Sequence, residues 1–104
     1  MQDFRKLRAW QSAHALTLRV YEVTAGCPES ERFGLTSQMR RSCASIGANI
    51  AEGCSRQTDA EFRRFAFIAI GSAAETENFA ILRRDLGYLD EAVSGSLIDE
   101  LASI

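Results

Sequence analysis

Carboxylates and histidines are the residues of this 104-residue chain that could hold a metal ion. Helical proteins that bind metal pairs carry inward-facing glutamates and a Glu-x-x-His repeat on two helices. The chain has one histidine, His14, and no histidine lies three residues after any glutamate, including Glu52, Glu61, Glu75 and Glu77. We therefore expect no metal site.

The thiols and hydroxyls do not form a catalytic pattern either. The chain has an odd number of cysteines, Cys27, Cys43 and Cys54. Residues 1–5 also lack the apolar core of a secretory leader. Both observations favour free thiols in a reducing cytoplasm. The cysteines and His14 lack the close ligand pairs of a zinc site, and no serine lies in an activating motif. We expect a non-catalytic, cytoplasmic protein with no catalytic residues and no cofactor.

Arginine side chains are the strongest candidates for binding a ligand. Eleven of the twelve basic residues are arginine, whose planar guanidinium suits bidentate contact with phosphate. A net charge of −2 argues against a general polyanion binder, so binding requires a local patch. The candidate nucleic-acid-binding residues are Arg40, Arg41, Arg56, Arg63 and Arg64. The alternative is a solvated face in which these arginines pair with Glu52, Asp59 and Glu61.

Polar residues also recur inside two otherwise apolar segments. Asn49 and Glu52 lie in one, and Ser72 and Glu75 lie in the other. A carboxylate or amide within a helix bundle must find partners or lose free energy. We expect these four residues to form a buried or interfacial polar cluster that fixes helix register. The alternative is that Glu75 reaches solvent past a helix edge.

Four helices must position these groups. The period of the apolar residues and the residues that start and stop helices predict helices over residues 5–25, 35–52, 58–86 and from 90 onward. A Thr58–Glu61 capping box begins the third helix, Gly87 ends it, and Asp90 is the N-cap of the fourth. The predicted buried side of the first helix is Leu7, Trp10, His14, Thr17, Leu18 and Tyr21. No apolar run approaches the length of a membrane span. The short connections favour an all-α, antiparallel up-down four-helix bundle, with residues 1–104 forming one domain.

The third helix carries two separate apolar stripes. One is Phe62, Phe65, Ala69, Thr76, Phe79 and Leu86; the other, on the far side, is Phe67, Ile70, Ala74 and Ile81. A single bundle buries one of them well. Because exposed apolar patches on small proteins mark association, we expect the second stripe to be the interface of a homo-oligomer. The alternative is a central helix that touches two neighbours of its own chain.

The order of motifs along the chain carries a resemblance. These motifs are SIGANIAEG at 45–53, EFRRF at 61–65, IAIGSAAE at 68–75, FGLTSQ at 33–38, RR at 40–41, DLGYL at 85–89, and DFRKL at 3–7 with Trp10, His14 and Tyr21. Together they resemble the 23S rRNA intervening-sequence protein family over nearly the whole chain. The resemblance implies a small bacterial four-helix bundle and brings no catalytic residues.

A branch of that family resembles the accessory protein of diversity-generating retroelements, a pentameric bundle that binds nucleic acid and a reverse transcriptase. The resemblance therefore implies a homopentamer, with RNA or DNA and a reverse transcriptase or another protein as partners. We expect a non-catalytic, homo-oligomeric, nucleic-acid-associated accessory protein. The alternative is an oligomeric protein–protein adaptor that binds no nucleic acid. A membrane is not an expected partner.

Overall fold

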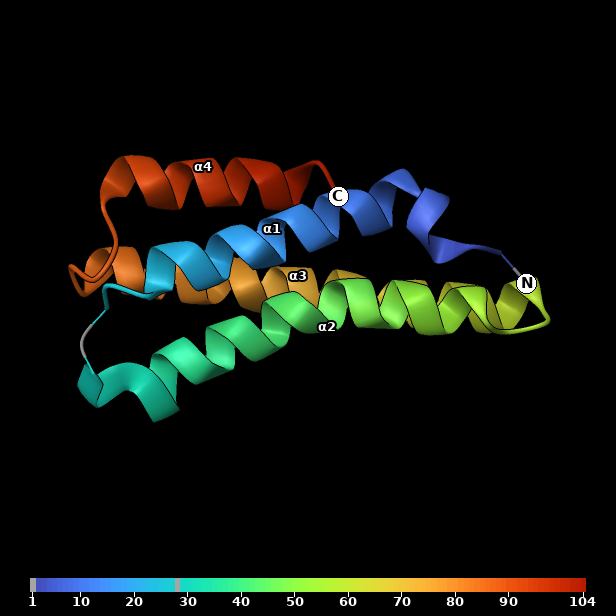
Figure 1. Ribbon diagram of the computed structural model, residues 1–104, viewed down its shortest axis with the longest axis horizontal. Helices are drawn as coiled ribbons and strands as arrows, with labels where there is room; N and C mark the ends of the chain where they lie inside the picture. The colour runs from blue at the N-terminus through green and yellow to red at the C-terminus, as the bar shows by residue number, and fades with distance from the viewer. Residues whose placement is uncertain (1, 28) are drawn as a thin grey trace.

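The structure is a computed structural model that describes residues 2–27 and 29–104, and within these residues it is all-α (Figure 1). Four α-helices carry the fold: α1 (Arg8–Thr24), α2 (Ser37–Cys54), α3 (Asp59–Asp85) and α4 (Glu91–Ala102). Three short turns accompany them: η1 (Phe4–Lys6), η2 (Glu29–Glu31) and η3 (Arg32–Thr36). The prediction of an all-α protein with four helices is confirmed.

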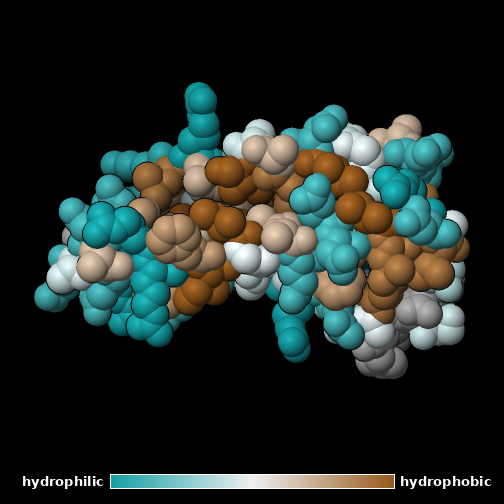
Figure 2. All heavy atoms as spheres, turned by 180° about the vertical axis from the view of Figure 1, so that it is seen from behind, coloured by the Kyte–Doolittle hydropathy of each residue, from teal (hydrophilic) through white to brown (hydrophobic). Residues whose placement is uncertain are grey.

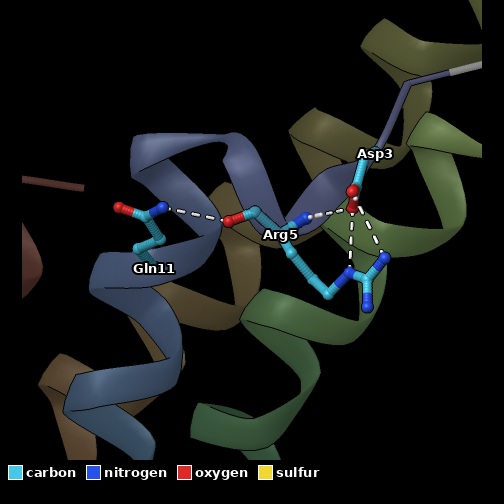
Figure 3. Close-up of polar contacts among 3 residues, drawn as sticks. All are labelled: Asp3, Arg5 and Gln11. Atoms are coloured by element: carbon cyan, nitrogen blue, oxygen red, sulfur yellow. Dashed lines mark hydrogen bonds and ion pairs between the residues drawn. The ribbon is translucent and has the colours of Figure 1, made fainter.

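The first helix begins three residues later than predicted because Asp3 caps a separate turn. The Asp3 carboxylate accepts hydrogen bonds from the backbone N–H of Arg5 at 3.1 Å and from the Arg5 guanidinium at 3.0 and 3.2 Å (Figure 3). These bonds hold the pKa of the Asp3 carboxyl below its usual value. The Gln11 amide donates to the Arg5 carbonyl at 2.9 Å, which ties η1 to the first turn of α1.

The buried side of α1 differs from the prediction. Ala13, Leu16, Val20 and Thr24 are buried, whereas His14, Leu18 and Tyr21 are exposed. The reason lies in α2, where a Cβ atom on Gly47 would stand 3.4 Å from the Trp10 indole nitrogen and 3.9 Å from the Ala13 Cβ. The missing Cβ of Gly47 lets both Ala13 and the half-buried Trp10 approach α2 closely. Of the predicted row, His14, Leu18 and Tyr21 lie outside this contact and stay exposed.

The predicted ends of α3 and α4 are confirmed. The Thr58 hydroxyl accepts from the Glu61 N–H at 3.2 Å, and Asp90 accepts from the Ala92 N–H at 2.7 Å, as N-caps do. Gly87 has φ = 80°, the left-handed conformation that ends a helix without a Cβ clash. The Tyr88 N–H then returns to the Arg83 carbonyl at 2.8 Å and closes the last turn.

The core is covered unevenly because the last helix is short. Met39, Cys43, Ile46 and Ile50 of α2, which recur at spacings of three and four residues, are buried in the core. At 1.5 Å per residue, the 27 residues of α3 extend roughly 40 Å, whereas the 12 of α4 extend roughly 18 Å. In Figure 1, α4 ends near the middle of the molecule. The first half of α3 therefore lies beyond the reach of α4.

The length and composition of α3 correct one sequence-based expectation. A window of 18 residues within this helix has a mean hydropathy of 1.2, which meets the criterion for a membrane span, although only 17% of the window is buried. The core helix of a soluble protein meets the same criterion. The prediction that no apolar run approaches this length was therefore wrong. The apolar surface of α3 is mostly uncovered within one chain.

Candidate interaction surfaces

The five candidate arginines do not form one patch. Arg40 and Arg41 lie in the first turns of α2, whereas Arg56 follows its end and Arg63 and Arg64 lie near the start of α3. Sixteen residues of near-continuous helix put roughly 24 Å between Arg40 and Arg56. The expectation of a single cluster was therefore wrong, because its members flank opposite ends of α2.

Arg40 is engaged within the chain. Its Nε donates to the Thr24 hydroxyl at 2.9 Å and a terminal nitrogen donates to the Tyr21 carbonyl at 3.2 Å. Its guanidinium also lies 4.6 Å from the centre of the Tyr21 ring, within the range of a cation–π contact. Arg40 joins the end of α1 to the start of α2 through two of its donors. Its neighbour Arg41 is exposed, and no ion pair recorded for the described residues includes it.

The other three arginines gather at the turn between α2 and α3. Arg56 pairs with Glu52 at 3.0 Å, one helical turn before it. The guanidinium groups of Arg56 and Arg64 lie 4.8 and 5.7 Å from the centre of the Phe65 ring. Arg63 is exposed and takes part in none of the ion pairs among the described residues. This end of the bundle, with Arg56, Arg63 and Arg64, is the part of the predicted patch that the structure keeps together.

The predicted polar cluster of Asn49, Glu52, Ser72 and Glu75 is not assembled within one chain. The Asn49 amide donates to the Ser45 carbonyl of its own helix at 2.8 Å, and Glu52 pairs with Arg56. Glu75 is exposed and makes no recorded hydrogen bond or ion pair to a described residue. The placement of Glu75 toward the core was therefore wrong, because α3 turns this carboxylate outward.

A different polar pair of contacts links α2 to α3. The Ser42 hydroxyl lies 2.8 Å from the Thr76 hydroxyl, and the Ser45 hydroxyl donates to the Ser72 hydroxyl at 2.6 Å. Ser72 is thus the one member of the predicted cluster that bonds across the two helices. Spacings of three residues on α2 and four on α3 put these hydroxyls on facing turns. That spacing is the signal in the sequence for this contact.

The second apolar stripe of α3 is open to solvent. The exposed fractions are 69% for Phe67, 64% for Ile70 and 36% for Ile81, and Ala74 is exposed as well. The alternative that a neighbouring helix of the same chain covers this stripe was therefore wrong. Leu86, predicted in the buried stripe, is 52% exposed because it follows the last residue of α3. Figure 2 shows hydrophobic side chains gathered along the rear face of the molecule.

An apolar groove of about 440 Å³ adjoins this stripe where α4 ends. Its lining is hydrophobic apart from Arg8, and its members come from the residue before α1, from all four helices and from the chain end: Leu7, Arg8, Ala9, Ile46, Ile50, Phe62, Ala66, Ala69, Ile70, Ala73, Leu101 and Ile104. Ile70 belongs to both the groove and the stripe. The groove is therefore continuous with the part of the stripe on the first half of α3, Phe67 and Ile70.

The remaining chemistry-bearing groups do not converge on a reaction centre. In the part of the chain that the structure describes, no group of three or more His, Cys, Asp or Glu side chains could hold a metal ion. His14 stacks on Trp10 with ring centres 4.8 Å apart. Sequence reasoning missed Arg83, which is fully buried beside Cys27 and Thr36. Arg83 lies in the last turn of α3 between Leu82 and Arg84, and no local signal in the sequence distinguishes it from Arg84.

The chain is similar to known proteins in sequence and in fold. The sequence profile described as the 23S rRNA-intervening sequence protein matches residues 5–104. A solved structure with the same fold is that of a protein of unknown function from the S23 ribosomal protein family of Bacteroides thetaiotaomicron. It is 26% identical, with a TM-score of 0.81 over 91% of this chain and 89% of that chain. No curated protein matches this chain.

Proposed function

Since this chain belongs to the 23S rRNA-intervening sequence protein family, we propose that it is a non-catalytic, cytoplasmic scaffold built as a homo-oligomer. In this proposal each copy is an antiparallel up-down four-helix bundle, and the copies associate through the second stripe of α3. A pentamer is the expected assembly. The scaffold presents its remaining surfaces to a protein partner, with a reverse transcriptase as one candidate.

The uncovered surface of α3 is the observation that carries this proposal. Phe67 and Ile70 expose about two thirds of their area and continue into an apolar groove. Burial of apolar surface stabilises by about 25 cal/mol per Å², so a large contiguous patch favours association. In a pentamer the stripe of one copy packs against a different surface of the next copy, and this contact repeats around the ring, because such rings are built from heterologous interfaces.

Mass measurement of the purified protein tests self-association. Light scattering after size-exclusion chromatography is expected to give a mass several times the 11.5 kDa of one chain. Phe67→Asp introduces a charge into the stripe and is expected to shift the protein toward the monomer. Leu18→Asp is the matched control, because Leu18 is 60% exposed on α1, outside the stripe. A monomeric parent protein, or equal effects of both variants, would contradict the proposal.

Nucleic-acid binding is the second candidate function, and the grouping of Arg56, Arg63 and Arg64 at one end of the bundle supports it. In an oligomer, several copies of this small basic end act together through multivalency. We propose RNA or DNA as the ligand, held by its phosphates. The nearby acidic residues Glu52 and Asp59 lower the affinity of one copy for nucleic acid, so this function depends on assembly.

Salt dependence separates the two functions. Binding of a labelled structured RNA is expected to weaken steeply between low and physiological salt, since each phosphate contact releases counterions. The variant Arg63→Glu/Arg64→Glu is expected to flatten this slope, whereas Arg84→Glu, at the opposite end of α3, leaves it unchanged. Absence of binding at low salt by an oligomeric parent protein would leave the protein scaffold as the function.

A further inference from the structure

Arg83 is a fully buried cation whose donors outnumber its acceptors. A guanidinium carries five N–H donors. Within the part of the chain described, its recorded acceptors are the Cys27 sulfur, 2.7 Å from a terminal nitrogen, and the Thr36 hydroxyl. The Nε of Arg83 is buried without any hydrogen-bond partner. Because a buried, unsatisfied donor costs free energy, an oxygen acceptor added next to Nε would lower the free energy of this site.

The sulfur at the centre of this site differs from the other two thiols. Cys27 is half-buried between α1 and η2, and its Sγ also lies 3.6 Å from the Tyr88 carbonyl. Cys43 and Cys54 are buried, and burial raises the pKa of both thiols. The structure thus places the one half-buried sulfur against a guanidinium, whereas the other two thiols are buried. The two buried cysteines are internal controls within the same chain.

We propose that Cys27 is a site of oxidation by hydrogen peroxide, and that Arg83 assists the reaction and then holds the oxygen that is added. The sulfur lone pair attacks one peroxide oxygen, an S–O bond forms and the O–O bond breaks. The leaving hydroxide takes the thiol proton and departs as water, so Cys27–SH and H₂O₂ give Cys27–SOH and H₂O. The Arg83 guanidinium stabilises the negative charge that develops on the leaving oxygen.

The product relieves the imbalance at the buried cation. The new sulfenic oxygen is an acceptor for the Nε–H of Arg83, which has no hydrogen-bond partner in the reduced protein. Arg83 belongs to the last turn of α3, Thr36 precedes α2, and Cys27 follows α1. Oxidation therefore adds a hydrogen bond at the point where these three segments meet. The oxidised protein is expected to be more stable than the reduced protein.

The test compares the rate of sulfenic acid formation at each cysteine. The full chain is treated with hydrogen peroxide, trapped with a sulfenic-acid-specific reagent, and mapped by mass spectrometry in buffer and in urea. Cys27 is expected to react about tenfold faster in the folded chain than in the unfolded chain, the effect of one charge-assisted hydrogen bond. If exposure of the sulfur alone set the rate, Cys27 would react faster in the unfolded chain, because unfolding exposes the sulfur. A folded rate at or below the unfolded rate would overturn the proposal.

Variants assign the effect to Arg83. Arg83→Gln is expected to slow oxidation of Cys27 about tenfold, whereas Arg84→Gln, at the neighbouring half-buried arginine, leaves it unchanged. Should Arg83→Gln fail to fold, the thermal midpoint decides: peroxide raises it in the parent protein and leaves it unchanged in Cys27→Ser. A midpoint that peroxide lowers, or moves equally in both proteins, would contradict stabilisation of the product by Arg83.

Discussion

At the scale of single residues, arginines in this protein divide into those that hold the chain together and those left to solvent. Arg40 donates hydrogen bonds to Thr24 and Tyr21, and Arg83 is buried against Cys27 and Thr36. Arg41 and Arg63 are exposed, with no recorded partner among the described residues. Residue type alone does not separate these roles, because the same guanidinium serves as a structural clamp or as a phosphate ligand.

Replacing Arg40 is expected to destabilise the fold, although the residue was a candidate for nucleic-acid binding. Arg40→Ala removes two hydrogen bonds and a cation–π contact between α1 and α2, which costs roughly 1–2 kcal/mol. Arg41→Ala, at the exposed neighbour, is expected to change stability by less than about 0.5 kcal/mol. Urea denaturation of both variants measures the difference. Equal stabilities would show that the Arg40 contacts are not maintained in solution.

At the scale of elements, the contact between α2 and α3 depends on small residues. A Cβ atom on Gly53 would stand 3.1 Å from the Phe65 Cβ and 3.4 Å from the Phe62 carbonyl oxygen. The neighbouring backbone of α3 cannot move aside without disturbing its own hydrogen bonds. Gly53 is therefore required for the two helices to approach, and it lies inside α2 rather than ending it as the sequence predicted.

Two glycine-to-alanine variants with opposite outcomes test this contact. Gly53→Ala is expected to destabilise the protein by roughly 1–3 kcal/mol, because it overpacks the contact of α2 and α3. Gly95→Ala in α4 meets nothing within 4 Å, so it is expected to stabilise by roughly 0.5–1 kcal/mol through helix propensity. Thermal and urea unfolding measure both. A stabilising Gly53→Ala would mean that α2 and α3 lie farther apart than described.

At the scale of the whole molecule, α3 is longer than the bundle that covers it. On α3, Glu75 is exposed, and Phe67 and Ile70 are exposed to solvent beside the groove. A single copy therefore exposes apolar surface that an assembly would bury, and its folding is expected to be coupled to that assembly.

This coupling predicts a stability that depends on protein concentration. The thermal midpoint of the parent protein is expected to rise over a hundredfold increase in concentration, because mass action favours the assembled, folded state. In Phe67→Asp the midpoint is expected to be independent of concentration, and in Leu18→Asp it should rise as in the parent. Scanning calorimetry at several concentrations measures this. A constant midpoint in the parent would place the apolar surface of α3 outside any subunit interface.

Local signals in the sequence determined the elements and their ends. The N-caps Thr58 and Asp90 and the stop at Gly87 act within one turn of themselves, so they could be predicted without knowledge of the fold. The buried row of α2 followed from its period. The motifs also sufficed for the family, since they keep their order and spacing over residues 5–104.

Tertiary structure alone decided which side of each helix is buried and which polar groups contact each other. The close approach of Ala13 to α2 depends on Gly47, and Arg83 meets Cys27 although the two residues lie 56 positions apart in the sequence. Glu75 turns outward and the arginines separate because helix rotation and relative placement depend on packing between elements distant in sequence. Periodicity defines stripes on a helix, but only the neighbours that a stripe meets determine whether it becomes core, interface or solvent-exposed surface.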